Sequence, residues 1–403
     1  MSDAHIEPNW TRVPLRRLAV CRDDLREPVN ATDRASMQGD IPYWGANAIK
    51  GYVNRAKVAC PVVLLGEDGA PFYDRDRPVA FYVDEPIWPN NHIHVLFPNR
   101  GVDGRWLAYA LNAVDYSTVI TGSTRDKLTQ GAMMSISLAT PTSDEQRAIA
   151  DYLDQETAQI DALVAKQEEF IGLLRERRDA AWAFGLERAI AERPPIPLRR
   201  AITSIVDGPF GSSLTSAHYA DSGTRVIRLG NIGTNSFRVE DEAYIPDSYA
   251  DQLAGHNVRP GDVVIAGLGD ETWPLGRAAV VPDIGPAIVK ADCFRARPAA
   301  GVSGSYLAWA LSAPQTRSQV ALLARGSTRK RINTSIARTI EIPVPSPERQ
   351  ESILGDSEDE LSRIDALISK AEEHIALAKE RRSALITAAV TGQFDVRTAR
   401  KAG

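Results

Sequence analysis

The stretch Ile160-Asp161-Ala162-Leu163, together with Glu176-Arg177-Arg178, decides the organisation of this chain because it occurs twice. It returns 204 positions later as Ile364-Asp365-Ala366-Leu367 and Glu380-Arg381-Arg382, and 12 of 19 aligned positions are identical without a gap. A match of this kind indicates an internal repeat. We therefore predict two copies of one plan, each ending in this stretch.

Both copies of the stretch lie in long segments that are typical of helices. Thr142 with Glu145 fits a capping box at the start of the first helix, and Ser346 followed by Pro347 fits the start of the second. The apolar residues recur with a 3,4 spacing, which predicts a seam for a partner helix. The residues that we expect in this seam or in partner docking are Ile160, Leu163, Phe170, Leu174, Ile364, Leu367 and Ile375.

Roughly 40 residues at about 1.5 Å each make a rod of about 60 Å, which is too long to be a surface helix of one small domain. We expect the two rods to pack antiparallel and to separate two globular domains with pseudo-twofold symmetry. Pro194-Pro195-Ile196-Pro197 should stop the first rod. Gly392 should end the second.

Each half of the chain opens in the same way, with Val13-Pro14-Leu15-Arg16-Arg17 and Ile196-Pro197-Leu198-Arg199-Arg200. Short apolar runs separated by Gly, Pro, Asn and Asp follow, and these are typical of strands joined by tight turns. The expected fold class is α+β, with two globular mixed α/β domains separated by two long antiparallel coiled-coil helices. The expected boundaries are 1–141, 142–193, 194–345, 346–392 and a tail at 393–403.

Composition is that of an ordinary globular protein, with 403 residues, 43% hydrophobic and 25% charged residues. We expect a cytoplasmic protein without a membrane partner, because no apolar run reaches the length of a membrane span. The net charge is −5, yet residues 143–193 alone hold 7 Lys and Arg against 12 Asp and Glu. The net charge therefore does not exclude DNA binding by the rest of the chain.

No catalytic constellation can be identified. Gly267-Leu268-Gly269-Asp270 is followed by Trp273-Pro274, which favours a hairpin over a phosphate-binding loop that opens a helix. Asp207-Gly208-Pro209-Phe210 lacks the second proline of the motif that holds a flipped base in amino-methyltransferases, and we interpret it as a turn into a strand. His92 and His94 favour a structural role over metal binding, because no ligand pattern accompanies them. We predict no catalytic residue and no metal site.

Binding residues are better indicated than catalytic ones. An irregular segment of the first half and a strand leading into a turn of the second half combine aromatic, amide and cationic side chains, which can contact bases and phosphates. These candidates are Tyr43, Trp44, Asn47, Lys50, Arg225, Arg228 and Asn231. For Tyr43 and Trp44, packing beneath a glycine-turn hairpin is an equally good interpretation, and the two roles are compatible.

A Gly-Ser-Thr sequence precedes a cationic run in both halves. Such a run can grip phosphates, although a helix start with a solvated basic face would have the same sequence. The residues concerned are Arg125, Lys127, Arg329, Lys330 and Arg331.

These features in this order resemble the DNA-specificity subunit of type I restriction-modification systems. The residues that carry the resemblance are the Pro-Leu-Arg-Arg starts, Tyr43-Trp44-Gly45-Ala46-Asn47, Leu65-Gly66-Glu67-Asp68-Gly69, Gly208-Pro209-Phe210-Gly211-Ser212 and Arg228-Leu229-Gly230-Asn231-Ile232. The chain departs from the family's usual pattern at Arg349-Gln350, where Glu-Gln is more common, and in the Arg that follows each Gly-Ser-Thr.

The resemblance implies that each globular part is a target-recognition domain for one half of a split site in double-stranded DNA. It implies that the helices space these domains and dock two methyltransferase subunits, and that two translocase-nuclease subunits join where a restriction enzyme forms, a system of phage defence. It implies no cofactor in this chain, S-adenosylmethionine for the complex, and ATP with Mg²⁺ for restriction.

Two other classes of function remain as alternatives. One is a coiled-coil scaffold that binds proteins and no DNA, which the mildly acidic balance favours and the basic stretches disfavour. The other is an autonomous DNA methyltransferase or nuclease, which the lack of catalytic and cofactor motifs makes the least favoured.

Overall fold

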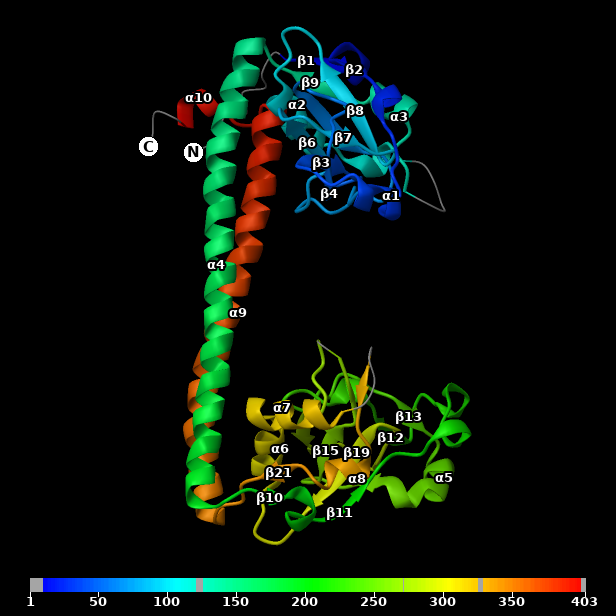
Figure 1. The fold of residues 1–403 in the computed structure, drawn as a ribbon, viewed down its shortest axis with the longest axis vertical. Coiled ribbons are helices and arrows are strands. Elements are labelled where there is room, and N and C mark those ends of the chain that lie inside the picture. Colours follow the sequence, from blue (N-terminus) through cyan, green and yellow to red (C-terminus); the bar gives the residue numbers. More distant parts are fainter. Residues whose placement is uncertain (1–9, 121–125, 271, 325–328, 400–403) are drawn as a thin grey trace. The chain divides into compact units, whose positions relative to one another are not determined.

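The structure is a computed structural model that describes residues 10–120, 126–270, 272–324 and 329–399. It divides into two compact units, the first made of Met1–Glu169 and Ala371–Gly403 and the second of Phe170–Lys370. Each unit contains part of both long helices, α4 (Ser143–Glu192) and α9 (Pro347–Thr391) (Figure 1). The five sequence ranges expected above follow the type of element rather than compactness, and they remain a prediction.

Unit 1 is built on a four-stranded antiparallel sheet with α2 (Gly104–Asn112) packed against it. The sheet order is β2 (Ala19–Cys21), β8 (Ile93–Pro98), β5 (Val62–Gly66) and β6 (Ala80–Val83). A second sheet has the order β4 (Ile49–Val53), β3 (Ile41–Trp44) and β7 (Trp88–Pro89). Unit 1 also contains β1 (Thr11–Pro14) paired with β9 (Ser137–Thr140), α1 (Ala31–Ser36), α3 (Gln130–Ser135) and α10 (Val396–Ala399).

Unit 2 repeats the central sheet of unit 1, with the order β11 (Ile202–Val206), β19 (Cys293–Pro298), β15 (Val263–Ala266) and β17 (Ala278–Val280). Helix α6 (Gly304–Ser312) packs on it as α2 does in unit 1. A second sheet has the order β13 (Tyr244–Ile245), β12 (Thr224–Ile227), β18 (Ala287–Val289) and β14 (Asn257–Val258). Also present are α5 (Asp247–Ala250), α7 (Pro314–Leu323), α8 (Thr334–Ala337), and β10 (Ile196–Pro197) paired with β21 (Glu341–Ile342).

The shared start of each half has one structural role. Leu15 and Leu198 are fully buried at the beginning of a short 3-10 helix that follows β1 or β10. Each proline precedes this turn, with φ near −68° for Pro14 and −57° for Pro197. The two arginines after each leucine are exposed. The shared start therefore anchors the chain in the core through its leucine and presents two cations to solvent.

Within each unit the two long helices run antiparallel. In unit 1, Asp161 of α4 pairs with Arg382 of α9 at 2.9 Å. In unit 2, the equivalent ion pair joins Asp365 of α9 and Arg178 of α4 at 2.8 Å. The repeat therefore extends to side-chain contacts between the helices, and the expectation of a mixed α+β fold with two long antiparallel helices is confirmed within each unit.

The buried seam of the helices agrees with the expected apolar pattern at some positions and departs from it at three. Ile160, Leu174 and Ile364 are buried as expected, and Ile375 is half-buried. By contrast, the exposed fractions of Leu163, Phe170 and Leu367 are 50%, 43% and 45%, so these residues lie outside the seam. The buried positions of the two helices instead include Ile171, next to Phe170, and the small or polar residues Thr157, Ser357 and Ala371. A seam that includes Thr, Ser and Ala cannot be identified from large apolar residues alone.

The ends of the long helices agree with the sequence signals. The Thr142 backbone N–H donates to the Glu145 carboxylate at 3.0 Å, which completes half of the capping box, and Glu145 N–H donates to the Thr142 hydroxyl at 3.4 Å. Pro347 is the first residue of α9, and Gly392 follows its end with φ +78°. No helix in the described part of the chain is long and apolar enough to cross a membrane.

Candidate nucleic-acid interface

A two-stranded ribbon in unit 2 carries the cationic run of the second half. Its strands are β16 (Leu268–Gly269) and β20 (Lys330–Arg331), which pair antiparallel. Lys330 and Arg331 are neighbours on one strand, so their side chains point to opposite faces. Lys330 accordingly lines one pocket with Asp270, and Arg331 lines another with Asp207. Both cations are exposed, as is Arg329 before them.

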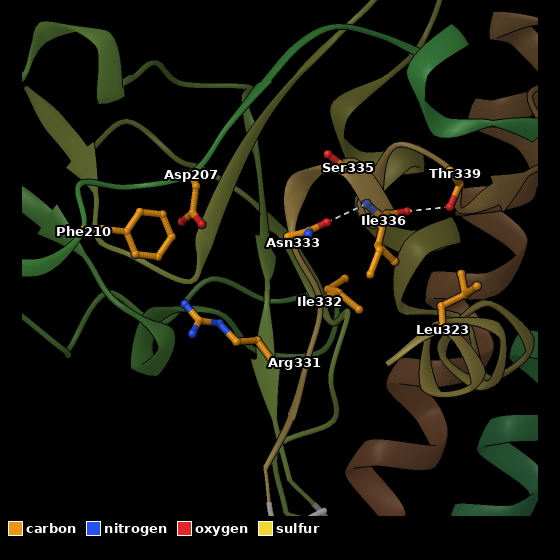
Figure 2. A pocket seen from close by; sticks show the side chains of 9 residues that line it. All are labelled: Asp207, Phe210, Leu323, Arg331, Ile332, Asn333, Ser335, Ile336 and Thr339. Carbon is orange, nitrogen blue, oxygen red and sulfur yellow. Dashed lines mark hydrogen bonds between the residues drawn. The ribbon is translucent and has the colours of Figure 1, made fainter. Parts of the chain in front are cut away.

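The Arg331 side chain is held in place by two groups. Its Nη2 lies 2.7 Å from Asp292 Oδ1, and its guanidinium lies 5.7 Å from the centre of the Phe210 ring. Figure 2 shows Arg331 extending toward Phe210 and Asp207 at the edge of a pocket of about 550 Å³. Apolar side chains form much of this pocket, namely Phe210, Leu323, Ile332 and Ile336. The guanidinium thus has a fixed direction while its side chain stays 52% exposed.

Asp292 has a backbone conformation that few residues with a side chain adopt, with φ +67°. Its N–H donates to Asp207 Oδ1 at 2.9 Å, and the same carboxylate oxygen accepts the Gly208 N–H at 2.7 Å. Burial raises the pKa of Asp207 to about 6, and the nearby negative charge of Asp292 acts in the same direction. Asp207 therefore supports the backbone of Asp292. The sequence suggested that its segment is a turn into a strand; in the structure the segment follows β11 and leads into a 3-10 helix at Gly211–Ser213.

Lys127 in unit 1 has a similar environment. It pairs with Asp68 in an isolated antiparallel bridge, and its Nζ lies 2.9 Å from Glu67 Oε1. Glu67 also forms an ion pair with Arg26. Burial acts to raise the pKa of Glu67, but the hydrogen bonds from Lys127 and Arg26 outweigh it and hold the pKa below its usual value. Arg125, the other candidate of this run, lies outside the described residues.

His94 is the buried member of a polar cluster beneath this bridge. Its Nδ1 contacts Asp23 Oδ2 at 2.6 Å and its Nε2 contacts the Leu128 carbonyl at 2.9 Å. With Cys21 these residues are near enough to one another to hold a metal ion. Both ring nitrogens of His94 are already engaged, however, so the arrangement favours a structural role. His92 lies apart from it, and its Nδ1 contacts the Asp68 carboxylate.

The aromatic candidates of the first half are packed rather than exposed. Tyr43 and Trp44 are 3% and 9% exposed on β3, and the Tyr43 hydroxyl accepts the Val29 N–H at 2.9 Å. The Gly45 N–H donates to the Ala48 carbonyl at 2.8 Å, which closes the turn between β3 and β4. The structure therefore contains the glycine-turn hairpin that the sequence allowed. Lys50 is exposed beside this turn, and Asn47 is half-buried.

The candidates Arg225, Arg228 and Asn231 organise a loop of unit 2. Asn231 is fully buried, and its amide donates to the carbonyls of Arg238 and Asp241 at 2.8 and 2.7 Å. Arg228 forms an ion pair with the Asp241 carboxylate. Arg225 is 6% exposed and donates to the Val239 carbonyl. These contacts direct Arg225 and Asn231 into the protein, whereas 35% of the Arg228 side chain stays exposed. A role in DNA binding for the three residues remains a prediction.

Sequence reasoning missed an aromatic and cationic group on the β16 side of the ribbon. Trp273 is 41% exposed, and the Arg238 guanidinium lies 3.9 Å from the centre of its ring. Below it, buried Arg277 donates to the carbonyls of Leu229, Ile232, Leu268, Trp273 and Pro274. Among the described residues, no helix follows Gly269 before β17. The Gly276 N–H donates to the Ala266 carbonyl and the Asp270 N–H to the Trp273 carbonyl, both at 3.0 Å, so the segment connects β15 and β17 as a hairpin, as the sequence predicted. The isolated arginines carried no motif that could have identified them.

A family model described as "Type I restriction modification DNA specificity domain" matches residues 27–170. A putative type I restriction enzyme specificity subunit of Haemophilus influenzae is 32% identical over 38% of this chain and 38% of its own length. The StySPI type I specificity subunit of Salmonella potsdam is 24% identical over 47% of this chain and 41% of its own length. The matches thus span about two fifths of these curated relatives.

The fold has a counterpart among solved structures over nearly its whole length. A structure reported for complex assembly and conformational transition of the type I restriction-modification system has a TM-score of 0.64 and 16% identity. The match covers 96% of this chain and 99% of that one. It shows that the two chains share a fold.

Proposed function

We propose that this chain, a homologue of type I restriction-modification specificity subunits, is the sequence-specific DNA-recognition subunit of such a complex. Each unit would read one half of a bipartite target in double-stranded DNA. The observation that carries the proposal is an exposed cation at the same place in each unit. It is Lys127 in unit 1 and Arg331 in unit 2, and each lies in a short segment that pairs with the end of the central sheet. A two-stranded ribbon fits the major groove, where all four base pairs can be distinguished.

The chain itself would contribute recognition and no catalysis. Methyl transfer would belong to a methyltransferase subunit that binds S-adenosylmethionine, and DNA translocation and cleavage to a restriction subunit that uses ATP with Mg²⁺. The complex would act in the cytoplasm, where the cell's own DNA is methylated.

Exposed leucines on the long helices supply two equivalent surfaces for two methyltransferase subunits. Leu163 and its repeat Leu367 are 50% and 45% exposed, and Leu173 and its repeat Leu377 are 57% and 55% exposed. Leu163 and Leu377 belong to unit 1, whereas Leu173 and Leu367 belong to unit 2. Identical apolar residues that stay exposed in both copies indicate a contact with a partner rather than packing.

Electrophoretic mobility of duplex DNA with the purified chain, alone and with the methyltransferase subunit, tests this function. We expect a shift that strengthens with the methyltransferase subunit and weakens as salt rises, because phosphate contacts release counterions. A scaffold that binds only proteins would give no shift in either case. An autonomous methyltransferase would label DNA from S-adenosylmethionine without any partner.

A further inference from the structure

Lys127 and Arg331 are related by the offset of 204 that relates the two long helices. Each is followed by a buried anchor, Leu128 or Ile332, whose N–H donates to the central sheet. The acceptors are the Glu67 carbonyl at 2.7 Å and the Gly267 carbonyl at 3.0 Å. The anchor fixes the backbone beside each cation in the same way in both units.

A carboxylate holds each cation, but it comes from a different residue in each unit. In unit 1 it is Glu67, whose N–H donates to the His92 carbonyl at 2.9 Å. In unit 2 the corresponding bond runs from Gly267 N–H to the Asp292 carbonyl at 2.8 Å, and Asp292 supplies the carboxylate. A side chain at Gly267 would not fit, because its Cβ would lie 2.3 Å from the Phe294 ring. We call this arrangement, a cation held by a carboxylate, the clamp. In unit 1 its carboxylate is on the residue that donates the backbone hydrogen bond, Glu67, and in unit 2 it is on the residue that accepts the equivalent bond, Asp292.

The clamp reduces the charge and fixes the direction of both cations, and in unit 2 it distinguishes Arg331 from the cations that precede it. The side chains of Lys127 and Arg331 are both 52% exposed, while those of Glu67 and Asp292 are 10% and 19% exposed. In the described part of the chain, Arg329 and Lys330 have no carboxylate partner. A free, flexible cation suits a phosphate. A cation that is partly neutralised and held in one direction is better suited to a base edge.

We propose that Lys127 and Arg331 are the base-reading residues of units 1 and 2, each donating to the O6 and N7 acceptors of a guanine in its own half-site. Glu67 and Asp292 are their positioning residues. This inference rests on the proposed function and adds to it the residue and the base read. Both side chains carry only donors, and guanine presents two adjacent acceptors in the major groove. One N–H of Arg331 Nη2 faces Asp292, and the second Nη2 N–H together with the adjacent Nη1 or Nε provides a fork of two donors for the base.

The test is methylome sequencing of a methylation-free strain that expresses the full chain with its methyltransferase subunit. We compare Lys127→Ala and Arg331→Ala with the matched controls Arg329→Ala and Lys330→Ala. Arg331→Ala should relax one guanine position of one half-site, and Lys127→Ala one position of the other. The controls should lower the extent of methylation and leave the motif intact, as expected for phosphate contacts.

Binding of the purified complex to duplexes with each base at that position gives the second measurement, which stays informative where a variant methylates poorly. The wild-type preference for guanine should be roughly 5- to 150-fold and should fall toward unity in Arg331→Ala. Arg331→Lys should retain part of it. Asp292→Asn, which tolerates the same backbone conformation, and Glu67→Gln should reduce the preference more than the overall affinity.

Three results would overturn the inference while the proposed function stands. They are an unchanged motif in Arg331→Ala and Lys127→Ala, a change in both half-sites from one substitution, and a uniform loss of affinity with the guanine preference retained. A wild-type chain that directs no motif at all would instead overturn the proposed function, and the inference with it.

Discussion

Gln146 and Gln350 are equivalent residues one turn into α4 and α9, and they are 2% and 0% exposed. The side chain of Gln350 accepts the Ser303 N–H at 2.9 Å and donates to the carbonyls of Gly301 and Pro345. Gln146 makes the corresponding bonds to Asp103 N–H and the Pro141 carbonyl. This amide bonds each long helix to its globular part in the same way, which explains why the glutamine recurs although its neighbours Glu145 and Arg349 differ.

Replacing Gln350 with Leu should destabilise unit 2 locally. The variant leaves a buried N–H and buried carbonyls without partners, at a cost of about 1–3 kcal/mol for each such group. Hydrogen exchange of the Ser303 amide is the measurement, and we expect it to accelerate. Glu351→Leu, an exposed change on the same turn, is the control and should leave the rate as in the wild type. A wild-type rate in Gln350→Leu would contradict this role.

Asp207 gives a prediction about pH. Its pKa is about 6 in the folded protein against an ordinary value near 3.8, mainly because the group is buried. Between these values the folded state holds a proton that the unfolded state has lost, so stability falls as pH rises from about 4 to about 6. Asp207→Asn keeps the acceptor oxygen and removes this titration. The difference in melting temperature between variant and wild type should therefore grow over that interval and be constant above it. A difference that does not change with pH would refute the assignment.

Contacts between individual side chains were the feature least predictable from the sequence. The cations Lys127 and Arg331 could be selected because they follow a repeated Gly-Ser-Thr. Their clamps could not, because Glu67 lies in what the sequence indicates as a turn and Asp292 lies 39 residues before Arg331. Tyr43 and Trp44 have the composition of a binding segment, and only the register of β3 places them in the core.

At the scale of elements, the repeated stretch Ile364-Asp365-Ala366-Leu367 contains one buried and one exposed apolar residue, so the exposed one can serve as the control for the buried one. Ile364 is 3% exposed in the seam between α9 and α4, whereas Leu367 is 45% exposed. Ile364→Ala should lower the free energy of unfolding by about 2–5 kcal/mol, because it leaves a cavity. Leu367→Ala should change it by no more than about 0.5 kcal/mol. Chemical denaturation of the full chain measures both.

The same pair tests the docking surface. Leu367→Ala should weaken association with the methyltransferase subunit at unchanged stability, as measured by titration calorimetry. If Leu367→Ala unfolds the helices and binds its partner normally, then the leucine belongs to the seam after all, and the proposed surface is wrong.

Long elements were the part of the fold that the sequence predicted well. The ends of the long helices are set by local signals, because each helix begins or ends next to the residue that signals it. These residues are Thr142 and Pro347 at the starts and Pro194 and Gly392 at the ends. The phase of the seam was not predictable in the same way. Thr157, Ser357 and Ala371 are buried in it, and such residues leave no apolar signature.

At the scale of the whole molecule, the chain is a tandem duplication in which helices and anchors are alike and the surfaces that would meet DNA differ. The central sheets share one strand order, and the ion pairs Asp161–Arg382 and Asp365–Arg178 are copies of each other. The clamped cation is a lysine in one unit and an arginine in the other. Two unlike half-sites are the expected consequence.

The helices should set the spacing of these half-sites. Adding one heptad to both α4 and α9 inserts about 10 Å of helix, which corresponds to about 3 base pairs. We expect methylome sequencing to find the same two half-sites with a longer gap between them. An insertion of the same length in the turn between β17 and β18 should leave the gap unchanged. A heptad insertion that altered the bases themselves would argue against a spacing role.

The central claim is that this chain determines which DNA sequence a methyltransferase subunit modifies. Methylome sequencing of a strain with and without the chain, in the presence of the methyltransferase subunit, tests it most directly. The account predicts one split motif with two different half-sites that is methylated only when the chain is present. Methylation that does not depend on the chain, or a single contiguous motif, would contradict it.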